Sequence, residues 1–96
     1  MYGIKEKVLD EIRSIAQKYD VERVTLFGSR ARGDYKERSD IDLAFEGGDG
    51  ARFALDVNED TSTLLMFDVV DLGRSVQETL RQSIANEGIV IYEKRS

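Results

Sequence analysis

Two aspartates separated by one residue, Asp40 and Asp42, are the first candidates for chemistry in this sequence. On a strand, residues two apart point to the same face, so the two carboxylates would lie side by side. Like charges at this distance repel each other unless a cation lies between them. Hard divalent cations such as Mg²⁺ prefer carboxylate oxygens and share them with a triphosphate. The pair therefore predicts a magnesium site, and the solvated face of an edge strand is the structural alternative.

A glycine-serine pair precedes these acids and predicts a site for an anion. Gly28 follows a short apolar run, and a glycine allows a ligand to approach the backbone closely. We expect a short helix to begin here, with Ser29 as its cap and its unpaired N–H groups facing a phosphate. Arg30 and Arg32 add positive charge to this helix. Gly33 is expected to end it in a left-handed conformation.

A third acid, Asp68, interrupts the strongly apolar run of residues 64–72. An unpaired carboxylate in such a run costs free energy or becomes protonated, so we expect Asp68 to bind something. If this strand lies beside the one that carries Asp40 and Asp42, Asp68 completes a cluster of three carboxylates. Asp71 is an odd number of residues away and would face the opposite side, so it is the second choice for the third ligand.

Hydrophobic periodicity predicts an α+β fold, in which helices back a small mixed β-sheet. Ser75 and Glu78 have the spacing of a capping box, which predicts the start of a helix. The acids should lie on an open face of the sheet, with the glycine-serine corner at its rim. The expected helices cover residues 4–19, 51–59 and 76–86, and the expected strands cover 23–27, 41–46, 64–72 and 89–92, all within a single domain of residues 1–96.

Composition excludes several kinds of catalyst. The chain has no cysteine and no histidine, which removes thiol nucleophiles, disulfides, Ser-His triads, imidazole bases and the usual zinc sites. Residues 1–38 carry nine Lys and Arg against seven Asp and Glu, whereas residues 39–96 carry five against twelve. An acidic second half disfavours a nucleic-acid partner. No apolar run reaches membrane-spanning length and no secretory leader is visible, so a cytoplasmic protein is expected.

The motif that joins Gly28-Ser29 to Asp40-x-Asp42 resembles the signature of the DNA polymerase β-like nucleotidyltransferase superfamily. The fuller sequences, GSRARG at residues 28–33 and SDIDL at residues 39–43, resemble those of the minimal nucleotidyltransferase branch. That branch consists of small prokaryotic proteins, and many of them are antitoxins encoded beside a HEPN-domain toxin. The resemblance covers nearly the whole chain and implies a polymerase β-like palm fold. The family also carries a third acid in a strand at the place of Asp68.

The resemblance implies nucleotidyl transfer with two Mg²⁺ ions. Asp40 and Asp42 would bind both ions, and Asp68 would bind the ion next to the attacking oxygen. The residues expected to bind the nucleotide and its phosphates are Gly28, Ser29, Arg30, Arg32 and Ser39. ATP would be the donor, and a hydroxyl group of a HEPN-type partner protein would accept AMP. The alternatives are an antitoxin that acts by binding alone and a regulatory nucleotide-binding module.

Overall fold

The computed structural model describes residues 2–94, which form helices and strands in the predicted order. The helices are α1 (Glu6–Lys18), α2 (Gly28–Arg32), α3 (Gly50–Glu59) and α4 (Glu78–Glu87). The strands are β1 (Arg23–Phe27), β2 (Ile41–Glu46), β3 (Phe67–Asp71) and β4 (Ile89–Glu93). The predicted bounds of β1 and β2 are confirmed, because a glycine or a charged turn lies at their ends.

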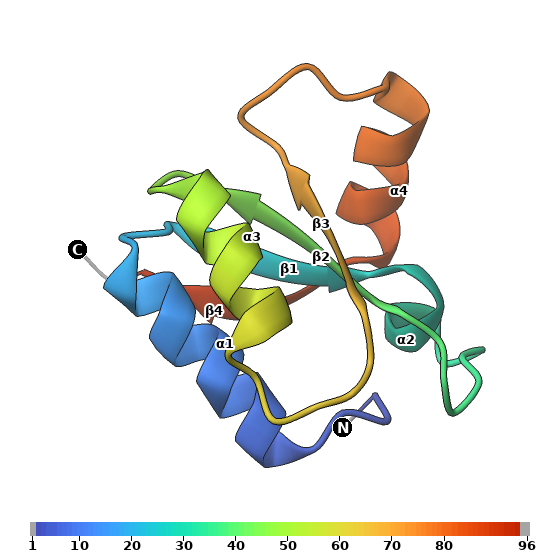
Figure 1. Ribbon diagram of the computed structural model, residues 1–96. Helices are drawn as coiled ribbons and strands as arrows, with labels where there is room; N and C mark the ends of the chain where they lie inside the picture. The colour runs from blue at the N-terminus through green and yellow to red at the C-terminus, as the bar shows by residue number, and fades with distance from the viewer. Residues whose placement is uncertain (1, 95–96) are drawn as a thin grey trace.

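The strands form one four-stranded sheet in the order β3-β2-β1-β4 (Figure 1). Strand β1 is antiparallel to both β2 and β4, whereas β2 and β3 run parallel. The sheet is therefore mixed, and the α+β prediction is confirmed. In its register Asp42 is paired with Phe27 on one side and with Asp68 on the other.

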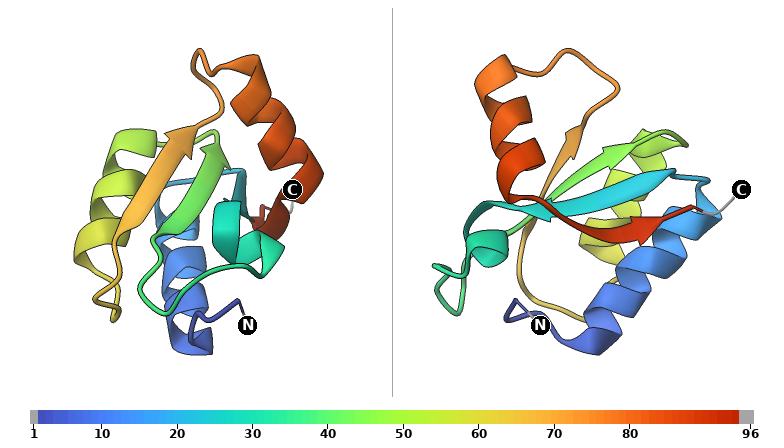
Figure 2. Two further views of the ribbon diagram at one scale, coloured as in Figure 1. Left: turned by 90° about the vertical axis from the view of Figure 1, so that its right-hand side faces the viewer. Right: turned by 180° about the vertical axis from the view of Figure 1, so that it is seen from behind.

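Helices α1 and α3 cover one face of the sheet, where the main core lies (Figures 1 and 2). The apolar residues of α1 recur at helical spacing, and Val8 and Ile12 are buried. Alternate residues of β2 point to the same side, because successive side chains on a strand face opposite ways. The ring centroids of Phe45 and Phe53 are 5.3 Å apart, so β2 and α3 are in direct contact.

Helix α4 packs on the opposite face and covers only part of it (Figure 2). A smaller cluster lies beneath it, in which Phe27, Ala44 and Ile84 are buried. Asp42 and Asp68 precede Ala44 and Val70 by two residues, so these acids share the face that α4 covers incompletely. The face with little cover therefore carries the predicted site.

Two predictions about element ends are wrong. Strand β3 begins at Phe67 rather than at residue 64, because its partner β2 begins only at Ile41 and leaves the preceding residues without a ladder. Leu64 is fully exposed as a result. Helix α4 begins at Glu78 with Gln77 as its cap and no side-chain capping bond, so Ser75 forms no capping box. Within the described residues, none of the helices has the length and apolarity needed to cross a membrane.

Candidate functional site

Asp42 and Asp68 lie directly opposite each other in the parallel pair of β2 and β3. Neighbouring strands are about 4.8 Å apart, and residues in register project to the same face. Asp42 is half-buried and Asp68 is exposed. From the sequence alone, Asp68 could join Asp40 and Asp42 only if its strand lay beside theirs. The register of β2 and β3 places Asp68 next to Asp42.

The pKa of the Asp42 carboxyl is raised above its ordinary value. Burial is the largest cause, and the negative charges of Asp68 and Asp40 add to it, while Arg32 and Arg30 oppose it. Carboxylate oxygens are the ligands that Mg²⁺ prefers, and a bound cation also relieves the repulsion between neighbouring carboxylates. The residues present therefore fit a hard divalent cation.

Asp40 lies outside the strand, on the exposed segment that precedes Ile41. Over residues 2–94, no three acidic side chains are already gathered closely enough to hold a metal ion. The predicted cluster of three carboxylates is thus not preformed. What the structure contains is the pair formed by Asp42 and Asp68, with Asp40 close enough to affect the Asp42 charge.

Asp71 lies on the opposite face and has other partners. Its Oδ1 accepts a hydrogen bond of 2.8 Å from the Gly73 N–H, and its Oδ2 is 3.5 Å from Nε of Arg74. A Cβ added at Gly50, the first residue of α3, would also lie 3.5 Å from this Oδ2. Asp71 therefore caps the end of β3 on the α3 side, away from Asp42.

Gly28 forms the corner between β1 and α2, with φ at +74°. A Cβ at this position would overlap Oδ2 of Asp42, so only glycine leaves room for that carboxylate. The expected cap at Ser29 is wrong, because α2 already begins at Gly28, with Phe27 as its cap and no side-chain capping bond. Ser29 instead lies in the first turn of α2. The predicted left-handed end at Gly33 is confirmed by its φ of 90°.

The two arginines of α2 have different surroundings. Arg32 is exposed, and its guanidinium pairs with Asp34 at 3.2 Å and with Glu87 of α4 at 2.9 Å. These two carboxylates raise its pKa further, so it stays charged. Because its positive charge also acts to lower the pKa of Asp42, Arg32 is the exposed cation of α2 near the site.

Arg30 is only 1% exposed, and its guanidinium donates to the backbone carbonyls of Tyr2, Glu37 and Ser39. This placement contradicts the expected phosphate contact of Arg30, because a buried and engaged guanidinium does not reach a ligand. The Ser39 hydroxyl accepts a hydrogen bond of 2.8 Å from the Lys36 N–H, so it closes a turn within the same loop. Sequence patterns gave no signal for either contact.

A hollow of about 400 Å³ lies beside Asp40. Leu64 and Met66 at its edge are 102% and 66% exposed. The apolar run predicts that both lie in a strand over residues 64–72, and this is wrong because hydrophobicity does not show where a partner strand ends. The lining residues are Glu37, Arg38, Asp40, Leu64, Leu65 and Met66.

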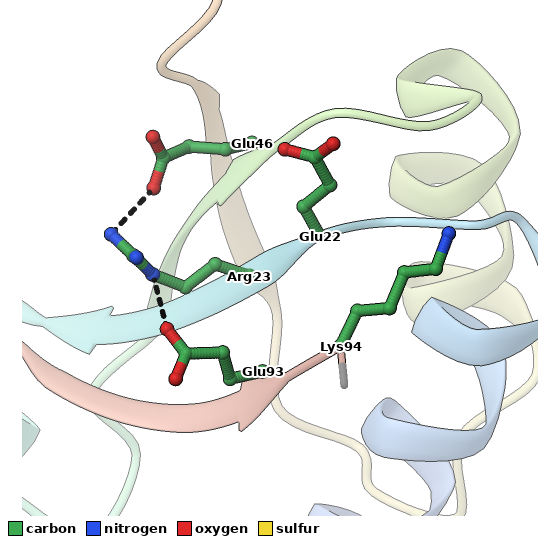
Figure 3. Close-up of a pocket in the computed structure, with 5 residues that line it drawn as sticks. All are labelled: Glu22, Arg23, Glu46, Glu93 and Lys94. Carbon is green, nitrogen blue, oxygen red and sulfur yellow. Dashed lines mark hydrogen bonds and ion pairs between the residues drawn. The ribbon is translucent and has the colours of Figure 1, made fainter. Parts of the chain in front are cut away.

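A different hollow, of about 330 Å³, lies at the other end of β1, away from Gly28 (Figure 3). Arg23 crosses it and pairs with Glu46 at 3.2 Å and with Glu93 at 3.0 Å (Figure 3). Lys94 on its rim pairs with Asp20. Its charges largely compensate one another, and none of the predicted site residues lines it.

Comparisons with known proteins agree with this geometry. The family model described as polymerase beta nucleotidyltransferase matches residues 10–96. A Methanocaldococcus jannaschii protein named "Putative protein adenylyltransferase" is 30% identical over 100 residues, which cover 92% of this chain and 98% of that protein. A crystal structure of a toxin–antitoxin with AMP-PNP gives a TM-score of 0.66 at 25% identity, over 91% of this chain and 74% of its own. A mutant of the toxin–antitoxin MntA-HpeT gives 0.70 at 20% identity over the same shares, which shows a common fold.

Proposed function

This chain belongs to the polymerase β nucleotidyltransferase family, and we propose that it transfers AMP from ATP to a hydroxyl group of a partner protein. Nucleotidyl transfer itself follows from the family, and the similarities confirm the resemblance to the minimal nucleotidyltransferase branch. The donor, the acceptor and the dependence on Mg²⁺ are our proposal. The observation that supports it most is the pairing of Asp42 with Asp68 beside the open corner at Gly28.

Asp40, Asp42 and Asp68 would hold the metal. When bound, Mg²⁺ would offset the charge of the phosphates and lower the pKa of the acceptor hydroxyl. The raised pKa of Asp42 supports this assignment, because burial and the nearby charges of Asp68 and Asp40 both disfavour its ionised form, and a bound cation would offset this cost. Asp68 is exposed, so it can meet both a metal ion and an incoming acceptor.

The corner of β1 and α2 would receive the triphosphate. Gly28 has no side chain to block the backbone next to Asp42, and Ser29 follows it in the first turn of α2. Arg32 would balance the charge of the departing pyrophosphate, because it is the exposed cation whose field reaches Asp42. In the reaction the acceptor oxygen bonds to the α-phosphorus, the bond to pyrophosphate breaks, and the hydroxyl proton passes to water.

A protein acceptor suits the surface beside Asp40. Leu64 and Met66 project from the edge of the hollow next to this acid, and exposed apolar side chains of this kind are typical of contacts with another protein. Two of the similar structures are described as toxin–antitoxin pairs, and the curated relative carries the name of a protein adenylyltransferase. We therefore propose a HEPN-type toxin as the partner and its silencing by AMP as the outcome.

The test is an incubation of the purified protein with its co-expressed partner, Mg²⁺ and ATP labelled in the α-phosphate. The wild type should transfer label to the partner, and Asp42→Asn should not, although its fold is retained. Label on the partner at the wild-type rate with Asp42→Asn would refute the proposed chemistry. If the double variant Asp40→Asn with Asp42→Asn still neutralises a toxin completely, binding alone accounts for the antitoxin role.

A further inference from the structure

We propose that Arg30 is a positioning residue, which holds the segment before Asp40 in place and so fixes Asp40 beside Asp42. This inference depends on the proposed function only for the metal role of Asp40. The contacts of Arg30 stand on their own, and they can be tested without metal or nucleotide.

Three of the four hydrogen bonds that Arg30 donates within residues 2–94 go to carbonyls of the segment before Asp40. Its Nε and Nη2 donate to the Ser39 carbonyl at 3.1 and 2.8 Å, and Nη2 also donates to the Glu37 carbonyl at 3.1 Å. The Ser39 carbonyl belongs to the peptide bond that enters Asp40. Two donors from one rigid guanidinium on this oxygen fix both the position and the direction of that bond.

Arg30 also connects this segment to the rest of the site. It lies in α2 two residues after Gly28, whose backbone contacts the Asp42 carboxylate. Residues 33–40 form no helix or strand, and their turn is closed by bonds between Lys36 and Ser39. The Arg30 guanidinium therefore connects the loop of residues 33–40 to α2, next to the corner at Gly28 and Asp42.

Burial explains why this position needs arginine. Across residues 2–94 the Arg30 guanidinium forms no ion pair, and backbone carbonyls and the Tyr35 ring, 4.9 Å away, compensate its charge. A buried cation is costly unless its donors are satisfied. Lysine carries its three N–H donors on a single nitrogen, so it cannot span carbonyls that Arg30 reaches from Nε, Nη1 and Nη2.

A purely structural arginine is the competing explanation. Arg13 offers a comparison, because its Nε also donates to a backbone carbonyl, that of Ile91, at 2.8 Å. Arg13 lies on α1, and its ion-pair partners are on α1 rather than among the acids of the candidate site. If Arg30 only stabilised the fold, Arg30→Lys and Arg13→Lys would differ in stability alone. If it positions Asp40, only Arg30→Lys changes the loop and the metal affinity.

The first measurement is hydrogen exchange on the metal-free protein. Peptides covering residues 34–40 should exchange at least about tenfold faster in Arg30→Lys than in the wild type, with no such change in Arg13→Lys. Should Arg30→Lys fail to fold, Arg30→Gln replaces it, because its uncharged amide avoids burying a cation but has no donors that reach the carbonyls bound by Arg30. Wild-type exchange of residues 34–40 in the folded variant would overturn the proposal.

The second measurement is a titration with Mn²⁺, followed by electron paramagnetic resonance, which does not depend on transfer activity. Arg30→Lys should bind Mn²⁺ several-fold more weakly than the wild type, and Arg13→Lys should bind it equally well. Unchanged Mn²⁺ affinity in Arg30→Lys would overturn the positioning role. Failure of the wild type to transfer AMP would instead contradict the proposed function and leave the exchange result standing.

Discussion

The carboxylate of Asp42 occupies the space that a Cβ would take at Gly28. Gly28 has a φ of +74°, and the register pairs its neighbour Phe27 with Asp42 across β1 and β2. The corner that is expected to admit the phosphates and the acid that is expected to bind the metal are thus in direct contact. A change at one of them should affect the other.

Gly28→Ala should therefore destroy activity by displacing Asp42. The new methyl group pushes the carboxylate away, and a misplacement of about 1 Å commonly costs about 100-fold in rate. Gly33→Ala is the matched control, since its φ is +90° but nothing lies within 4 Å of the added Cβ. Both variants should lose about 1 kcal/mol of stability from the left-handed backbone. Rates of AMP transfer that fall equally in the two variants would show that the contact with Asp42 is unimportant.

Asp42→Asn should stabilise the metal-free protein near neutral pH. The folded-state pKa of Asp42 is raised, so its ionisation costs the folded state free energy as the pH increases through 3.8 and the raised value. Removing a like charge opposite Asp68 should gain about 0.5 kcal/mol, or roughly 2–4 °C in Tm.

Thermal unfolding across pH checks this prediction. The advantage of Asp42→Asn should shrink as the pH falls through the raised pKa and vanish below 3.8, where the wild-type carboxyl is protonated in both states. Added Mg²⁺ should raise the Tm of the wild type more than that of the variant, because the cation binds the charged form. A lower Tm for the variant without metal would mean that Asp42 stabilises the fold.

The fold was largely predictable because its signals are local. Glycines and charged turns mark the ends of β1 and β2, and the alternation within β2 places Asp42 on one face and Leu43 on the other. The pairing of β3 with β2 was a conditional prediction, because a single sequence carries no register. The structure supplies that register and with it the neighbour of Asp42.

The role of Arg30 could not be predicted for a similar reason. Its partners Tyr2, Glu37 and Ser39 are brought to it by folding, and backbone carbonyls have no sequence signature. Ser29 does not cap α2, because the helix starts one residue earlier, at Gly28, which has a positive φ and no room for a Cβ beside Asp42.

The double variant Leu64→Ser with Met66→Ser should transfer AMP to the protein acceptor more slowly. Leu64 and Met66 are exposed, so replacing both should change stability by no more than about 0.5 kcal/mol. Loss of their contact area should lower kcat/KM for the acceptor roughly tenfold, at unchanged affinity for ATP. Leu55→Ser is the control, because Leu55 is 54% exposed on α3 and does not line the hollow beside Asp40. If Leu55→Ser lowers kcat/KM for the acceptor by the same factor, Leu64 and Met66 have no special role in binding the acceptor.

We expect Asp68, which is paired with Asp42 on one face of the sheet, to complete the set of catalytic acids, and Asp71 to have no catalytic role. The most direct test compares Asp68→Asn with Asp71→Asn in Mg²⁺-dependent transfer of labelled AMP. Asp71→Asn keeps an Oδ1 that accepts the Gly73 N–H, so its fold should be preserved. We predict that Asp68→Asn loses at least about 100-fold in rate and that Asp71→Asn retains most of it. Full activity in Asp68→Asn, or an equal loss in both variants, would contradict this account.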